Sequence, residues 1–199
     1  MLLDSTRPLG NPVNIEHDRP ENRSAGDLKS WYVLRATYSR EMKIQAQLNG
    51  LGVRCFIPMM WRRKASDTNA DKKLVPAVNN LCFVYWTRQD IDDYIRSFGE
   101  KSPVAYYWDR IAGKALTVPD DAMENFIKVA STLDEDLIYL TAISEKLREG
   151  QAVKVKDGPF AGVVGRIVRI RKSRRILVEI PGMLAVATTY VTPDNLEMI

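Results

Sequence analysis

One stretch near the C-terminus, residues 153–170, constrains the fold more than any other part of the chain. It reads VKVKDGPFAGVVGRIVRI, two runs of alternating apolar and polar residues on either side of a segment rich in glycine and proline. Alternation of this kind predicts two β-strands, and an Asp-Gly dipeptide favours a tight turn between them. Pro159 has no N–H to donate to a sheet, and Gly162 and Gly165 tolerate the backbone angles or close approach that a turn or bulge requires. The stretch therefore predicts a β-hairpin that begins a small barrel.

The same stretch resembles the KOW motif, whose consensus is G-x-x-V-x-V-x-x-G-P-F-x-x-x-x-G-x-V. Eight positions agree with it: Gly150, Val153, Val155, Gly158, Pro159, Phe160, Gly165 and Ile167. The resemblance assigns the motif to Gly150, Asp157, Gly158, Pro159, Phe160, Gly162 and Gly165. Further strand patterns at 175–180, 184–189 and near 196 predict an SH3-like β-barrel over residues 150–199.

Composition places the chain among ordinary globular proteins, with 199 residues, 45% hydrophobic and 27% charged. This length suits two modest domains. The first residues carry too few apolar side chains for a signal peptide, and no run approaches the roughly 18 apolar residues that a membrane span needs. We therefore expect a cytoplasmic protein with no membrane contact. Cys55 and Cys82 form no C-x-x-C pair and His17 is the only histidine, so we expect buried free thiols, no metal site and no cofactor.

Positive charge is concentrated in the two parts that are expected to fold. Residues 31–130 hold 15 Lys and Arg against 11 Asp and Glu, and residues 150–199 hold 8 against 4. The connector, residues 131–149, is acidic, with 2 against 5. Basic domains favour a polyanion as a neighbour, although the same charge also fits a role in solubility alone.

The first 130 residues predict an α+β domain. Residues 1–28 are polar without hydrophobic period and predict a flexible tail. After them, strand and helix patterns follow in the order β-α-β-β-α-β-α, which predicts an α/β sandwich with a mainly antiparallel four-stranded sheet over residues 29–130. The expected strands are 31–36, 53–61, 81–86 and 104–108, and the expected helices are 40–51, 91–98 and one that starts at Pro119. Residues 131–149 read as a linker that could contain a helix.

Three strand sequences together with the KOW segment resemble the NusG family of transcription elongation factors over residues 29–199. They are Lys29 to Leu34, Phe56 to Met59 and Leu81 to Val84. The resemblance implies that the N-terminal domain, called NGN, docks on the clamp helices of RNA polymerase, and that the KOW barrel recruits other factors. It is closest to specialised paralogues of the UpxY and RfaH kind, which promote antitermination in long operons. This finer assignment rests on Val75 to Val84 and on the polar N-terminal extension, and we expect a monomer.

The resemblance also implies where the partners bind. Leu81, Phe83 and Tyr107 match polymerase-binding positions, and as one apolar face they could remain exposed for a helix pair; alternatively they are domain core. Arg35 and Arg40 match the side of NGN domains that approaches the non-template DNA strand. Nascent RNA is a further possible partner.

Two other basic groups have less definite roles. Arg62, Arg63, Lys64, Lys72 and Lys73 fit a solvated face, and Arg166, Arg169, Arg171, Lys172, Arg174 and Arg175 surround an expected hairpin turn and could bind RNA or an acidic protein. Where I-F-G-R would contact Rho or a small-subunit ribosomal protein, this chain has Ile180 to Met183, which argues against both partners. Phe160 is a possible substitute anchor or a packing residue.

An enzyme is not indicated. The chain has no Walker-type loop, no G-x-G-x-x-G and no G-x-S-x-G motif, and its only histidine lies in the expected tail. The main alternative is a KOW-type RNA- or ribosome-associated binding protein. The sequence leaves open whether the barrel masks the first domain or changes its fold.

Overall fold

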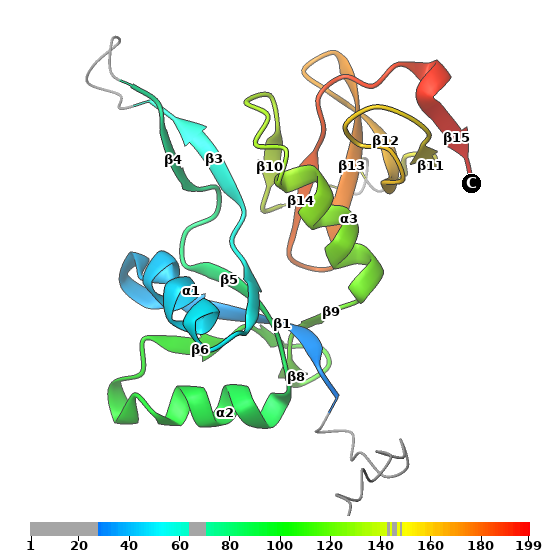
Figure 1. Cartoon of the computed structure of the whole chain (residues 1–199). Helices are drawn as coiled ribbons and strands as arrows, with labels where there is room; N and C mark the ends of the chain where they lie inside the picture. The colour runs from blue at the N-terminus through cyan, green and yellow to red at the C-terminus, as the bar shows by residue number, and fades with distance from the viewer. Residues whose placement is uncertain (1–27, 64–70, 143, 145–146, 148) are drawn as a thin grey trace, which may run out of the picture.

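The computed structural model describes residues 28–63, 71–142, 144, 147 and 149–199 (Figure 1). Two large β-sheets organise this part of the chain, and a helix lies between them. The tail expected at residues 1–28 falls outside the described residues except for Leu28, which is exposed.

The N-terminal sheet is antiparallel and is built around two adjacent strands, β1 and β5. Its strands are β1 Ser30–Ala36, β2 Arg54–Phe56, β5 Leu81–Trp86, β6 Val104–Tyr106 and β9 Thr117–Val118. The order is β2-β5-β1-β6, and β9 also pairs with β1. In the register of β1 and β5, Val33 lies opposite Phe83. The sheet therefore has five strands where four were predicted, because the two-residue strand β9 returns to β1.

Helices cover one face of this sheet. They are α1 Glu41–Gly50 and α2 Arg88–Arg96, with 3-10 turns η1 Thr37–Ser39 and η2 Gly99–Lys101. Ile44, Leu48 and Ile91 pack into the apolar cluster that contains Leu34 and Val84 from the sheet. A helix was expected at 40–51, and in α1 the helical spacing of Ile44 and Leu48 places both on the buried side.

Two hairpins extend from the sheet, and the first stands out clearly in Figure 1. The first joins β3 Met59–Arg62 to β4 Lys73–Pro76, and the second joins β7 Trp108–Asp109 to β8 Lys114–Ala115. The first hairpin lies between β2 and β5, and the strand expected at 53–61 is divided into β2 and β3. Its break from β2 falls at Pro58, which cannot donate a backbone hydrogen bond.

The C-terminal sheet follows the predicted strand pattern closely. Its strands are β10 Ile138–Leu140, β11 Ala152–Val155, β12 Val164–Ile170, β13 Ser173–Ile180, β14 Leu184–Ala187 and β15 Leu196–Met198, with the 3-10 turn η3 Pro193–Asn195 before the last. The order is β10-β14-β13-β12-β11-β15. Strand β10 lies in the segment predicted as a linker, where a helix was considered possible. Residues 138–140 are instead a strand, because they pair with residues 185–187 of β14.

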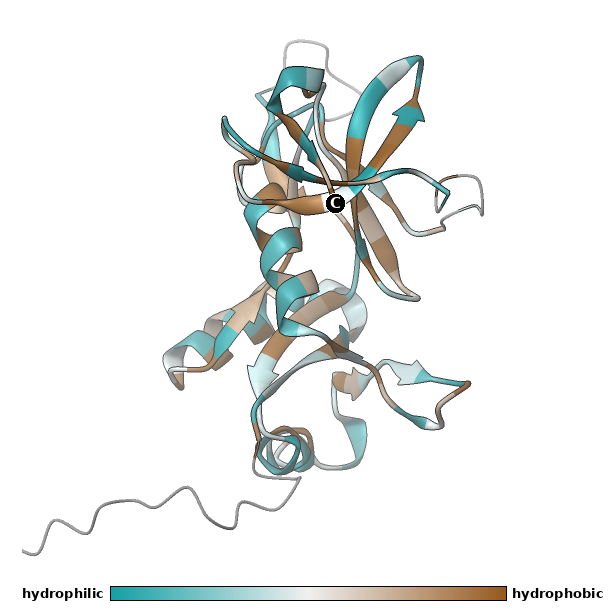
Figure 2. Cartoon of the chain, turned by 90° about the vertical axis from the view of Figure 1, so that its right-hand side faces the viewer, coloured by the Kyte–Doolittle hydropathy of each residue, from teal (hydrophilic) through white to brown (hydrophobic). Residues whose placement is uncertain are grey.

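Helix α3, Asp120–Ala130, connects the two sheets (Figures 1 and 2). In both views it runs along the C-terminal sheet, and β9 joins its first residue to the N-terminal sheet. Its buried side chains Met123, Phe126 and Val129 belong to one apolar cluster that includes Phe83 on one side and Ile176 on the other. The two sheets therefore share a continuous core through α3.

Candidate functional site

The three residues expected to bind polymerase lie on one face of the N-terminal sheet. Leu81 and Phe83 are on β5, and the backbone N–H of Tyr107 donates to the carbonyl of Val33 on β1 at 2.9 Å. All three side chains belong to the apolar cluster on the face opposite α1 and α2. The structure thus gathers residues that are 26 positions apart in the sequence, as the expected sheet requires.

This face is not open in the structure, which corrects the expectation of an exposed patch. Leu81 and Phe83 are each 0% exposed, and only Tyr107 is partly accessible. Phe126 of α3 covers them: its ring centroid lies 5.8 Å from that of Phe83 and 6.2 Å from that of Phe56. The covering helix follows β5 by more than 30 residues, so the pattern of β5 alone does not reveal it.

Further contacts hold α3 and the segment that follows it against the N-terminal domain. The ring of Tyr139 on β10 lies 6.5 Å from that of Phe126, and its hydroxyl donates to the carbonyl of Met59 on β3 at 3.3 Å. Burial raises the pKa of Tyr139 to about 12. An ion pair joins Lys72 beside β4 to Glu135 after α3. The hairpin β3–β4 therefore holds the segment that leaves α3.

The second expected site, Arg35 and Arg40, lies at the turn from β1 into α1. Both side chains are exposed. Between them, Tyr38 is 84% exposed and its ring lies 5.6 Å from the guanidinium of Arg40. Arg40 also borders a hollow of about 240 Å³ with Lys43 and Lys101. The sequence analysis missed Tyr38, Lys43 and Lys101. They lie beside Arg40 because of the turn between β1 and α1 and the fold of the chain at residue 101.

Asn80 holds this turn in an unusual conformation. Tyr38, Ser39 and Asn80 have φ angles of 60°, 52° and 60°. The N–H of Ser39 donates to the side-chain oxygen of Asn80 at 3.1 Å, and the N–H of Ala36 donates to its backbone oxygen at 3.0 Å. Asparagine tolerates the left-handed region better than most residues. Asn80 therefore supports the turn that presents Tyr38 and Arg40.

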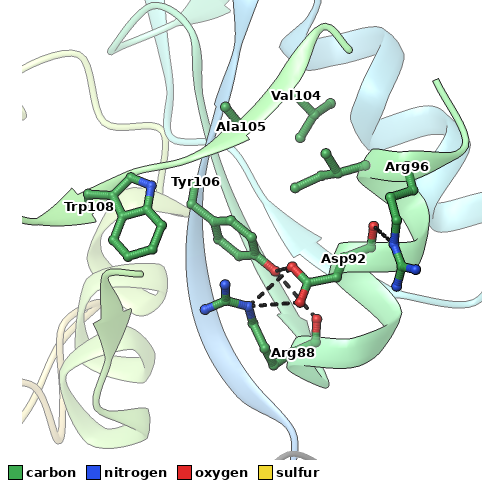
Figure 3. A pocket seen from close by; sticks show the side chains of 8 residues that line it. Arg88, Asp92, Arg96, Val104, Ala105, Tyr106 and Trp108 are labelled. Carbon is green, nitrogen blue, oxygen red and sulfur yellow. Dashed lines mark hydrogen bonds and ion pairs between the residues drawn. The ribbon is translucent and has the colours of Figure 1, made fainter. Parts of the chain in front are cut away.

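A second hollow, of about 460 Å³, lies between α2 and β6 (Figure 3). The hydroxyl of Tyr106 donates to Asp92 at 2.8 Å, Nε of Arg88 lies 3.2 Å from the same carboxylate, and the Arg88 guanidinium stands 4.3 Å from the Tyr106 ring centroid. Burial and the hydrogen bond to Asp92 raise the pKa of Tyr106. These three groups satisfy one another, and their evident effect is to fix α2 on the sheet.

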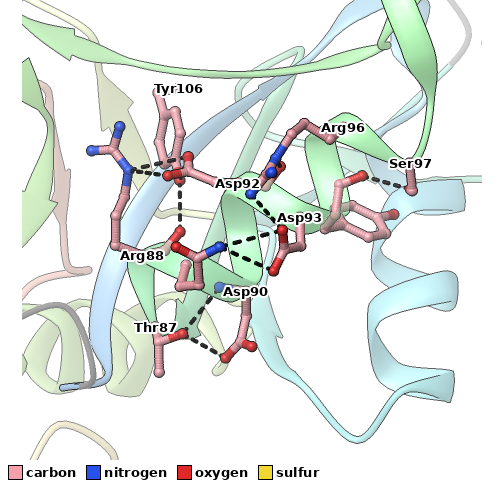
Figure 4. Close-up of polar contacts among 10 residues, drawn as sticks. Thr87, Arg88, Asp90, Asp92, Asp93, Arg96, Ser97 and Tyr106 are labelled. Atoms are coloured by element: carbon pink, nitrogen blue, oxygen red, sulfur yellow. Dashed lines mark hydrogen bonds and ion pairs between the residues drawn. The ribbon is translucent and has the colours of Figure 1, made fainter. Parts of the chain in front are cut away.

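The exposed side of α2 is stabilised by its own polar contacts (Figure 4). The N–H of Asp90 donates to the hydroxyl of Thr87 at 3.1 Å, which caps the helix, and Arg96 pairs with Asp93 at 2.5 Å. Arg96 also lines the hollow beside β6, where its pairing with Asp93 holds it on the helix. We assign α2 a supporting role.

The described residues contain no group of three or more His, Cys, Asp or Glu side chains arranged to hold a metal ion. Cys55 is half-buried and Cys82 buried, and both are free. The neighbouring Cys55 thiol and burial raise the pKa of Cys82 well above its usual value. No helix in the described part of the chain has the length and apolar character to cross a bilayer.

Comparison with known families covers both halves of the molecule. A family model described as "Transcription termination factor nusG" matches residues 29–127, from β1 into α3, and a KOW motif model matches residues 149–179. The chain belongs to the NusG family. Among solved structures, one titled "Domain interaction in Thermotoga maritima NusG" covers 86% of this chain and 97% of its own, at 21% identity and a TM-score of 0.45. Comparison with curated proteins gave no match.

Membership in the NusG family gives the chain a NusG-like role in transcription elongation. Proteins of this family are non-enzymatic transcription factors that bind RNA polymerase. The predicted fold class, an NGN-type α/β sandwich followed by an SH3-like KOW barrel, is confirmed. In the KOW segment Phe160 is 4% exposed and belongs to the shared apolar cluster, so here it is a packing residue rather than a free anchor.

Proposed function

We propose that this NusG-family chain binds the clamp helices of RNA polymerase through the apolar face of its N-terminal sheet and promotes processive elongation and antitermination. We further propose that it is a specialised paralogue, of the UpxY or RfaH kind, that acts on particular long operons. The observation that carries the proposal is the NusG-family match over the sheet on which Leu81, Phe83 and Tyr107 form one apolar surface.

The cover over this surface has a direct consequence for binding. A clamp helix can reach Phe83 only where α3 now places Phe126, so α3 and the KOW sheet must move away. Exchange of one helix for another on the same apolar face requires no new type of contact, because helices commonly dock into such grooves through their apolar side. Polymerase binding and separation of the two domains are therefore a single equilibrium in this proposal.

Arg35 and Arg40 would then contact the non-template DNA strand. Arginines supply charge for phosphates, and an exposed tyrosine such as Tyr38 gives a base a ring to stack on. We expect the variant in which both arginines are replaced by Ala to lose salt-sensitive binding to bubble DNA, measured on polymerase complexes. The control variant Arg110→Ala/Lys114→Ala removes the same charge from the exposed hairpin β7–β8 and should bind as the parent does.

The main experiment measures polymerase affinity and terminator readthrough in a purified transcription system. Leu81 and Phe83 are fully buried, so a charge there would disturb the fold as well as the surface. Tyr107 is half-buried at the same face, and we expect Tyr107→Asp to reduce affinity at least about 10-fold, with loss of readthrough. The control Tyr190→Asp changes a tyrosine that is 59% exposed in the C-terminal half and should leave both unchanged. Equal affinity of Tyr107→Asp and the parent chain would refute the proposed surface.

A further inference from the structure

The hairpin formed by β12 and β13 is strongly basic. Residues 164–178 contain six Lys or Arg and no Asp or Glu, and Glu179 near the end of β13 is the one acid in the two strands. Five of these side chains are exposed: Arg166, Arg169, Arg171, Lys172 and Arg174. No ion pair between described residues involves any of them. Arg166 donates to the carbonyl of Gly150 at 3.2 Å, and Arg175 is partly buried and donates to the carbonyls of Asp136 and Thr188 at 2.7 Å. The hairpin tip lies at the end of the molecule away from α1 and α2 (Figure 1).

The register and the turn place these charges where they oppose stability. Arg169 lies directly opposite Arg174 across the two strands, and like charges in that position repel. The turn consists of Arg171 and Lys172, since Ile170 pairs with Ser173. Both turn residues have positive φ, 50° and 66°, in a turn where Asn-Gly is the favoured sequence. The tip therefore carries four cations. Two lie in a strained backbone and two face each other, so these charges do not stabilise the fold.

The chemistry of the hairpin favours phosphates of a double helix. Arginine binds a phosphate through two parallel N–H groups, and most of the exposed cations here are arginines. Residues 164–178 contain no aromatic side chain, so the hairpin offers no platform on which the bases of a single strand could stack. A two-stranded β-ribbon fits the major groove of B-form DNA, whereas the deep, narrow major groove of duplex RNA does not admit it.

We propose that the β12–β13 hairpin is a binding site for duplex DNA, which it contacts through backbone phosphates without regard to sequence. The site goes beyond polymerase binding and does not depend on it, because it lies on the KOW sheet and needs no change at the face under α3. Each arginine that meets a phosphate releases counterions, so affinity must fall as salt rises.

The test measures binding of the full-length chain to a 24-base-pair DNA duplex by fluorescence anisotropy over a series of salt concentrations. Two variants remove charge at the tip: Arg169→Gln/Arg174→Gln, and the single change Arg174→Glu. The second places an acid opposite Arg169, which favours the hairpin, so loss of binding there cannot result from unfolding. The matched control Lys154→Gln/Lys156→Gln removes the same charge from exposed positions on and just after β11.

We expect the slope of log K against log salt to become shallower by about 1.8 in the double Gln variant, since each lost phosphate contact contributes about 0.9. Affinity near 0.1 M salt should fall on the order of 10-fold for each arginine removed. The Lys154/Lys156 control should retain the parent's slope. Three outcomes would overturn the proposal: no DNA binding by the parent chain, an unchanged slope in the tip variants, or tighter binding of duplex RNA, single-stranded DNA or poly-glutamate than of duplex DNA.

Discussion

At the scale of single residues, the turn at Arg171 and Lys172 lowers the free energy of unfolding by an amount that can be measured. A residue other than glycine in the left-handed region costs roughly 1–2 kcal/mol, and asparagine and glycine avoid most of it. We therefore expect Arg171→Asn/Lys172→Gly to raise the free energy of unfolding by about 1–2 kcal/mol in urea titrations. Gly158→Ala should do the opposite, because Gly158 has φ +88°, a conformation that strains alanine. An added Cβ would meet no atom within 4 Å, so the backbone alone causes the loss of stability. An unchanged or lower stability of the Asn-Gly variant would contradict the argument.

Tyr139 makes stability depend on pH in a defined window. Burial raises the pKa of its phenol to about 12, above the ordinary value of 10, so the folded state favours the protonated form. The contribution of the protonated Tyr139 to the free energy of unfolding is complete below pH 10 and is lost as the pH rises through 12. We expect the parent chain to lose stability relative to Tyr139→Phe between pH 10 and 12, measured by urea unfolding at a series of pH values. A stability difference that stays constant across this range would exclude the effect.

At the scale of elements, the KOW strands depend on glycine at a point of close contact. A Cβ added to Gly165 on β12 would lie 2.6 Å from the carbonyl oxygen of Leu177 on the paired strand β13. Because backbone cannot move aside cheaply, we expect Gly165→Ala to destabilise the protein by about 1–3 kcal/mol in urea unfolding. Gly50→Ala at the end of α1 meets no atom within 4 Å and should be neutral or slightly stabilising. Equal effects of the two changes would show that this contact is unimportant.

Local sequence was sufficient to predict most elements. The Asp-Gly turn, the glycines of the KOW segment and the alternation on either side predicted β11 and β12 because each signal acts within a few residues. The same holds for α1, whose buried Ile44 and Leu48 keep helical spacing. The two-residue strand β9 was missed, since two residues are too few to show a period and only pairing with β1 defines them.

Local sequence could not predict whether the candidate site is open or covered. Strand β5 is apolar on both faces, which fits a central strand and an exposed docking face equally well. What decides between them is Phe126, a residue on α3 that is distant in sequence and reaches Phe83 only through the tertiary fold. Tyr38 beside Arg40 was missed for a similar reason, because its exposure follows from a turn that Asn80 holds.

At the scale of the whole molecule, the shared core couples the two halves. The apolar cluster extends from Phe83 through α3 to Ile176 without a polar boundary. Two halves that share a core should unfold together, although each carries its own sheet. In the proposed function, polymerase would compete for this same core, so the strength of the coupling sets how readily the clamp-binding face opens.

The positions of the tryptophans allow the coupling to be measured. All four, Trp31, Trp61, Trp86 and Trp108, lie in the N-terminal half, so their fluorescence reports that half alone, whereas far-UV circular dichroism reports both. In the parent chain we expect the two urea transitions to coincide, and Gly165→Ala in the KOW sheet should lower the fluorescence midpoint as well.

Phe126→Ala removes the ring that contacts Phe56, Phe83 and Tyr139, at a cost of about 3–5 kcal/mol. We expect this variant to separate the fluorescence and dichroism transitions, because the two sheets then lose their common packing. The control Glu124→Ala lies on the exposed side of α3 and should leave them coincident. If Gly165→Ala leaves the fluorescence midpoint in place, the halves are independent, and access of polymerase to Phe83 would not require any disturbance of the KOW sheet.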